Sequence, residues 1–198
     1  VDAEYLARVG RMDRKLLAPV EHRGKEAQEA LAVLRSRDEL VKARTQLINH
    51  VRGTVKAAGG RVSSCSTDSF HRRVGGEVPE GLKPALEPVI QVIQKLTEQI
   101  RQQDDRVEEM AQKKYPETRK LMEVAGVGPI TSMAYVLTVE DPRRFNKSRA
   151  VGAYLGLRPG KRQSGDQDPQ MRITKCGDSM VRRLLVGSAH YILGPFGK

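Results

Sequence analysis

The sequence has no tryptophan, and aromatic residues make up only 4% of its 198 positions. A β-sandwich core draws heavily on aromatic and β-branched side chains. A core in this chain must instead come mainly from Leu, Val, Ile, Ala and Met, which suit packed helices. We therefore expect a mainly α fold.

Cysteines and long apolar runs are also scarce. Cys65 and Cys176 stand far apart, with no Cys-x-x-Cys pair and no histidine at metal-ligand spacing, which argues against a structural metal and a disulfide framework. No stretch approaches the roughly 20 apolar residues of a membrane helix, and we expect no signal peptide. Two unpaired cysteines fit a reducing compartment, so we expect a cytoplasmic protein that does not enter a membrane.

Acidic residues are too few to balance the bases. Lys and Arg number 35 against 24 Asp and Glu, which gives a formal net charge of +11. Such an excess bears on partners rather than on fold. Nucleic acid is the commonest polyanionic partner of a basic chain.

Two long segments carry apolar side chains at helical spacing. Over residues 25–58, the apolar positions Leu34, Val41, Ile48 and Val55 recur every seven residues. Over residues 79–114, the apolar steps alternate between three and four, and Gln103 fills the single gap. These patterns predict two long helices. With the Gly- and Ser-rich residues 59–78 between them, they predict a long antiparallel coiled-coil hairpin within residues 21–114.

This hairpin has two possible uses. Two helices bury little apolar surface, and dimerisation would supply more. A polar residue such as Gln103 in a seam often fixes oligomer state and register, so we favour a homo-oligomer, either a dimer or a tetramer. The alternative is a hairpin that packs, within one chain, under another domain.

The long apolar pattern ends before Tyr115–Pro116, where we place a boundary to a small helical domain over residues 115–198. Its stretch around Gly126, Val127 and Gly128 has the layout of a helix-hairpin-helix element. Glycine lets a backbone approach a phosphate closely, and the free amides of a helix that starts at Pro129 suit an anion. The plain alternative is a tight turn between helices.

A dense run of bases follows this turn. Between residues 143 and 183 there are eleven Lys and Arg and only three acids, an excess of eight positive charges. A solvated face would also be basic, but here the bases surround a Gly- and Pro-rich loop, which favours DNA contact. We expect nucleic-acid contacts from the turn and from part of this run, namely from Gly126, Val127, Gly128, Arg158, Lys161, Arg162, Arg172, Lys175, Arg182 and Arg183.

Five ordered motifs in this region resemble the C-terminal domain of the one-ten family of insertion-sequence transposases. These are the DEDD transposases, which are RNA-guided recombinases. The motifs are Gly-Val-Gly-Pro at 126–129, Asp-Pro-x-Arg-Phe at 141–145, Tyr-Leu-Gly-Leu-x-Pro at 154–159, Gln-Ser-Gly at 163–165 and Ile-Thr-Lys-x-Gly at 173–177. The resemblance spans roughly residues 115–193.

The N-terminus is similar to the end of that family's RuvC-like domain, which we place over residues 1–20. Asp2 would match the last of four metal-binding acids, and the other three would lie upstream. The resemblance thus implies a Mg²⁺ site that is completed only in a longer parent protein. It also implies DNA and a structured guide RNA as partners. The chain by itself is expected to be inactive.

The resemblance further implies that Ser164 attacks a DNA phosphodiester during strand cleavage and exchange. A serine hydroxyl is a weak nucleophile that needs activation, and Lys161 and Arg162 could stabilise charge on phosphorus. Two other readings remain. One is a non-catalytic helix-hairpin-helix DNA-binding module with a coiled-coil dimerisation arm, and the other is an assembly protein built on the coiled coil.

Overall fold

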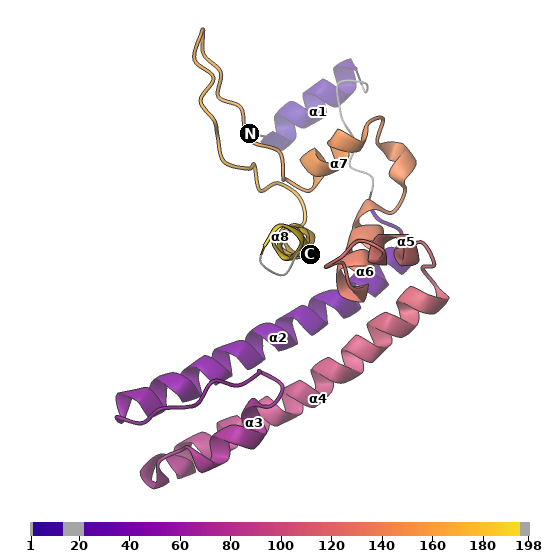
Figure 1. Cartoon of the computed structure of the whole chain (residues 1–198). Helices are drawn as coiled ribbons and strands as arrows, with labels where there is room; N and C mark the ends of the chain where they lie inside the picture. Colours follow the sequence, from indigo (N-terminus) through magenta and orange to yellow (C-terminus); the bar gives the residue numbers. More distant parts are fainter. Residues whose placement is uncertain (1, 14–21, 195–198) are drawn as a thin grey trace.

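The computed structural model describes residues 2–13 and 22–194, and these residues are mainly helical, as the composition predicts. These residues contain eight α-helices, together with turns and short 3₁₀ segments (Figure 1). They are α1 (Asp2–Met12), α2 (Lys25–Ala57), α3 (Phe70–Arg73), α4 (Lys83–Lys113), α5 (Thr118–Met122), α6 (Pro129–Val139), α7 (Ser148–Tyr154) and α8 (Ser179–Leu193). None of the helices in the described ranges is long and apolar enough to cross a membrane.

The long helices α2 and α4 lie side by side along their length and form the predicted hairpin (Figure 1). The seam positions Ile93, Ile100 and Val107 of α4 are buried, and so are Leu34 and Ile48 of α2. At 1.5 Å per residue, the 33 residues of α2 span about 50 Å. The hairpin therefore separates its two ends by a distance comparable to the size of a small domain.

The start of α4 is delayed relative to the prediction of a helix from residue 79. A single 3₁₀ turn, Glu80–Leu82, comes first, and the α-helix begins at Lys83. Pro84 lies in its first turn, where a missing amide hydrogen costs nothing. Pro88 lies inside the helix, where one hydrogen bond is absent from the α4 ladder.

The connector over residues 59–78 folds back onto the hairpin instead of looping into solvent. Phe70, Val74 and Val78 are buried in a core cluster with side chains of α2 and α4. Arg44 of α2, which is only 7% exposed, holds the connector against the hairpin. Its guanidinium donates to Asp68 Oδ1 at 2.7 Å and to Thr67 Oγ1 at 3.2 Å. This connector is thus a structural part of the hairpin tip.

A second core cluster lies at the opposite end of the hairpin. There α6 packs against both α2 and α4, and α8 packs against α6. Leu31 and Leu34 of α2 share this cluster with Met133, Leu137 and Val181 of the C-terminal helices. The core is therefore continuous across Tyr115–Pro116, where the sequence predicts a domain boundary, and the boundary itself stays a prediction.

The seam that suggested an oligomer is covered within one chain. Ile93 and Val107 are both 0% exposed in the single chain, so they need no second copy for their burial. This is the intramolecular alternative described above. The homo-oligomer stays a prediction, and it would have to use other surfaces.

Candidate nucleic-acid interface

Residues 158–175 form an extended two-stranded ribbon that projects from the helical body, and we call it the serine arm (Figure 1). The Thr174 amide donates to the Arg158 carbonyl at 2.9 Å, and the Gly160 amide donates to the Arg172 carbonyl at 2.9 Å. The sequence predicts only a Gly- and Pro-rich loop here. Isolated ladder hydrogen bonds instead hold the two segments together over part of their length.

Ser164 lies at the tip of this arm. Its amide and carbonyl both pair with Gln167, at 3.1 Å each, across a two-residue turn of Gly165 and Asp166. Gly165 has φ +57°, as a tight hairpin turn requires at its first central position. The Ser164 side chain is exposed, and no hydrogen bond to its hydroxyl is present within residues 2–13 and 22–194. The hydroxyl is therefore accessible but not activated by a neighbouring base.

The base of the arm depends on a close crossing of two backbone segments. Gly156 has φ +70°, and a Cβ at this position would stand 2.0 Å from the Cys176 carbonyl oxygen. Gly177 has φ +78°, and a Cβ there would stand 2.1 Å from the Tyr154 carbonyl oxygen. Only glycine fits at either position. The two motifs Tyr-Leu-Gly-Leu and Ile-Thr-Lys-x-Gly thus meet at one point of the fold.

Arg182 of α8 stabilises this crossing of the two backbone segments through hydrogen bonds. Its Nη1 donates to the Leu155 carbonyl at 3.1 Å and to the Cys176 carbonyl at 2.9 Å. The guanidinium therefore bridges the two segments that carry the arm. The structure gives Arg182, one of the expected nucleic-acid contacts, a role in positioning the arm.

The other predicted bases of the arm are free of partners. Arg158, Lys161, Arg162, Arg172 and Lys175 are all exposed, and none forms an ion pair with another described residue. Like charges on a narrow ribbon repel one another, so an anion laid along the arm would relieve this repulsion. The arm carries these five bases against two acids, Asp166 and Asp168, and so has a net positive charge.

The glycine turn lies between α5 and α6. Gly126 has φ +80°, and a Cβ here would stand 2.8 Å from the Tyr191 ring of α8. Gly128 precedes Pro129 and has open space around it. Val127 is half-buried. Packing against Tyr191 therefore explains Gly126, whereas Gly128 leaves the start of α6 open. The assignment as a helix-hairpin-helix element stays a prediction.

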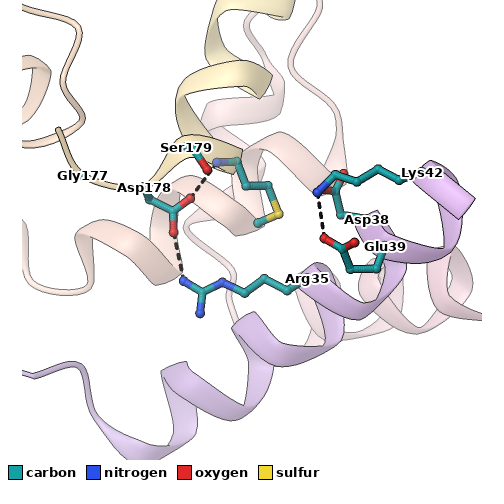
Figure 2. A pocket seen from close by; sticks show the side chains of 8 residues that line it. Arg35, Asp38, Glu39, Lys42, Gly177, Asp178 and Ser179 are labelled. Carbon is teal, nitrogen blue, oxygen red and sulfur yellow. Dashed lines mark hydrogen bonds and ion pairs between the residues drawn. The ribbon is translucent and has the colours of Figure 1, made fainter. Parts of the chain in front are cut away.

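A charged network joins α8 to α2 beside a cavity of about 390 Å³ (Figure 2). Arg183, another expected nucleic-acid contact, bonds Asp38 Oδ1 at 2.5 Å, and Lys42 pairs with Asp38 Oδ2 at 3.0 Å. Arg35 pairs with Asp178 Oδ2 at 3.0 Å. Arg183 is thus engaged within the chain, and this network docks the helix that carries the arm.

Asp178 caps the N-terminus of α8. Its Oδ1 accepts from the Met180 and Val181 amides at 3.0 and 3.1 Å. Burial alone would raise the pKa of Asp178, but the Val181 amide and the Arg35 guanidinium favour the carboxylate and bring the pKa below its ordinary value. Asp178 is therefore charged at neutral pH and stabilises both the helix end and its contact with α2.

The described residues do not assemble a metal site. Asp2 is exposed in the first turn of α1, and no group of three or more His, Cys, Asp or Glu within residues 2–13 and 22–194 could hold an ion. The acids that would accompany Asp2 are not among these residues. The predicted Mg²⁺ therefore stays a prediction about a longer protein.

Sequence reasoning missed the network on α2. Arg35, Asp38 and Lys42 face α8, yet in the sequence they look like ordinary solvated charges of a long helix. The i, i+4 spacing of Asp38 and Lys42 indicates a pair on one helix face. It gives no hint of Arg183, which lies 145 residues away from Asp38.

Comparisons with known proteins support the resemblance. Residues 118–193 match the model of the transposase family described as IS116/IS110/IS902. The chain is 29% identical, over 97% of its length, to a transposase for insertion sequence element IS1111A from Coxiella burnetii, and it is 28% identical to a probable family 20 transposase from Pseudomonas aeruginosa, also over 97%. A putative transposase from Sinorhizobium fredii is likewise 28% identical over 97% of this chain.

The chain spans about half the length of these curated relatives, with 54%, 58% and 50% of them covered. Their similarity runs through the hairpin as well as through the serine arm, because nearly all of this chain is aligned. Residues 118–193 thus match the IS116/IS110/IS902 family of transposases, and nearly the whole chain is similar to proteins named as transposases.

Proposed function

We propose that this chain is part of a transposase in which the serine arm delivers Ser164 to a DNA phosphodiester. The observation that carries the proposal is the position of Ser164, exposed at the tip of a projecting arm with five unpaired bases along it. The family supports transposition as the context. DNA is the polyanion that the bases of the arm would bind.

The chemistry is a transfer of a phosphoryl diester to serine. Ser164 Oγ bonds to phosphorus while the bond from phosphorus to the leaving strand's oxygen breaks. The hydroxyl proton leaves Ser164, and the departing oxygen takes up a proton. Lys161 and Arg162, close in sequence to Ser164, would stabilise charge on the phosphoryl oxygens. Joining to a new strand reverses the step and releases the serine.

Other parts of the proposal concern the intact protein. We infer that carboxylates outside the described residues hold Mg²⁺ and complete the site. We also infer that a structured guide RNA binds the intact protein and that the protein works as a homo-oligomer. The turn at Gly126, Val127 and Gly128 would contact a phosphate backbone in the manner of a helix-hairpin-helix element, because the start of α6 at Gly128 is open.

Replacement of Ser164 by alanine in the full-length protein tests the nucleophile. We expect Ser164→Ala to abolish strand cleavage and the covalent protein–DNA adduct, while DNA affinity stays nearly unchanged because the bases remain. Ser164→Cys, which keeps a nucleophilic atom at this position, should retain at most a trace of activity. Ser36→Ala, at an exposed serine of α2, is the matched control and should react like the unchanged protein.

Normal recombination by Ser164→Ala would overturn the nucleophile. That result would favour the second candidate, a non-catalytic DNA-binding module with a coiled-coil hairpin, which needs the bases but not the serine. The bases are tested separately with Lys161→Glu/Arg162→Glu. Loss of two phosphate contacts should flatten the slope of log affinity against log salt by about two.

A further inference from the structure

The tip of the hairpin carries a second cluster of bases, far from the serine arm. A cavity of about 350 Å³ is lined by Arg52, Lys56, Gly60, Arg61 and Val62. Three of these five residues are cationic and none is acidic. Within the described ranges, no carboxylate pairs with any of the three bases. The cavity therefore has a positive lining without a counter-ion from the residues that the structure describes.

The end of α2 builds this cluster. Arg52 and Lys56 are one helical turn apart, so they share a face. The helix then closes with a Schellman turn, in which the Gly60 amide donates to the Val55 carbonyl at 2.9 Å and the Gly59 amide donates to the Lys56 carbonyl at 3.0 Å. This turn reverses the chain and brings Arg61 to the same cavity.

The Arg52 side chain is held in place, but its guanidinium uses few of its hydrogen-bond donors. Its guanidinium carbon lies 5.5 Å from the centroid of the Phe70 ring. Its Nη2 makes a long contact of 4.0 Å to Cys65 Sγ, and its buried Nε has no hydrogen-bond partner among the described residues. Stacking thus fixes the cation, while most of its donor capacity is unused.

Structural roles account for only part of this arrangement. A base in the last turn stabilises the negative end of a helix dipole, which explains Lys56. Stacking on Phe70 explains the position of Arg52. Neither role explains why Arg61 joins them in one cavity with no acid, because like charges brought together destabilise a surface.

We propose that this cavity, the tip site, binds a phosphate of a nucleic-acid backbone. Phosphodiester oxygens would accept from the preset guanidinium of Arg52 and from the flexible cations of Lys56 and Arg61. Nucleic acid is chosen over other polyanions because the whole chain has a formal net charge of +11. A backbone contact of this kind carries no sequence preference.

The tip site lies far from Ser164, and its binding of nucleic acid does not depend on the function proposed for that serine. It lies at one end of α2, and the arm projects from the other end of the molecule (Figure 1). Since α2 spans about 50 Å, one short segment of nucleic acid does not reach both. The chain can thus hold a second segment, or a distant part of a long one, away from the serine.

Lysine protection locates the contact without any mutation. The chain is acetylated at low reagent concentration with and without a 30-base-pair DNA duplex or an RNA hairpin, and each lysine is quantified by mass spectrometry. We expect either nucleic acid to protect Lys56 severalfold, whereas Lys95, an exposed lysine of α4, reacts equally in both samples. Protection of Lys161 reports on the serine arm in the same experiment, so failures of the two proposals are distinguishable.

Charge variants test the energetic contribution. Lys56→Glu/Arg61→Glu should lower the salt slope of binding by about two, and the neutral Lys56→Gln/Arg61→Gln should lower it by a similar amount without adding repulsion. Lys95→Glu/Arg106→Glu, at two exposed positions of α4, changes the net charge equally and should alter the slope much less.

Three outcomes would overturn the tip site. The first is Lys56 acetylation that neither nucleic acid slows. The second is an equal loss of slope in the α4 control, which would assign the effect to net charge. The third is protection by a polyglutamate peptide but not by nucleic acid, which would assign the cavity to an acidic protein segment.

Discussion

Replacement of Gly156 by alanine tests the backbone crossing at the base of the serine arm. Gly156 is buried with φ +70°, and a Cβ would stand 2.0 Å from the Cys176 carbonyl oxygen and 2.5 Å from its nitrogen. The left-handed conformation costs an ordinary residue about 1–2 kcal/mol. The clash is with backbone, which cannot rotate away, so overpacking adds about 1–3 kcal/mol.

The expected loss of stability is therefore about 3 kcal/mol. For a chain of this length it corresponds to a fall of about 6–12 °C in the melting temperature. Thermal unfolding followed by far-ultraviolet circular dichroism measures the fall. Gly152→Ala is the matched control, because Gly152 lies in α7 with no atom within 4 Å of an added Cβ. Alanine should leave α7 unchanged or stabilise it by up to about 1 kcal/mol.

If Gly156→Ala melts at the same temperature as Gly152→Ala, the crossing is not as close as described. A second readout is the position of the arm. Because the crossing sets where the arm projects, Gly156→Ala in the full-length protein should also reduce strand cleavage. Cleavage at the unchanged rate by a destabilised variant would separate the stability of the crossing from any role in placing Ser164.

Three further predictions concern other parts of the fold. Ile93→Asp buries a charge in the α2–α4 seam and should cost several kcal/mol in urea unfolding, whereas the adjacent exposed Gln94→Asp should cost less than about 1 kcal/mol; equal losses would contradict the seam. Asp178→Ala should cost about 1–2 kcal/mol at pH 7 through the lost helix cap. Because the folded pKa of Asp178 is lowered, this difference from the unchanged protein should be present above about pH 4 and should shrink as the pH falls further; a difference that grows in acid would refute it. Arg44→Ala should release the connector and increase proteolysis near Asp68, and an unchanged digestion pattern would show that Arg44 does not anchor it.

Several features depend on contacts that no local pattern contains. Phe70 stands in a Gly- and Ser-rich stretch that reads as a loop, yet its side chain is 0% exposed because the stretch folds onto α2 and α4. Arg182 looks like one base in a basic run, but it donates to two carbonyls of the arm base. In both cases the partners are distant in sequence, and periodicity says nothing about them.

The sequence by itself determined the helical class and the two long helices. It predicted a helix over residues 25–58, and the structure has it over Lys25–Ala57, because apolar periodicity and a glycine stop are local signals. The family motifs likewise identified the transposase family, because they lie in order along the chain.

Only the tertiary structure decided how these pieces meet. The sequence left open whether the seam is covered by a second chain or by the hairpin, and Ile93 and Val107 are buried within one chain. It also left Ser164 in an unspecified loop, whereas the crossing of Gly156 and Gly177 extends that loop as an arm. The physical reason is that burial and close backbone approach are sums over residues far apart in the chain, which local spacing does not specify.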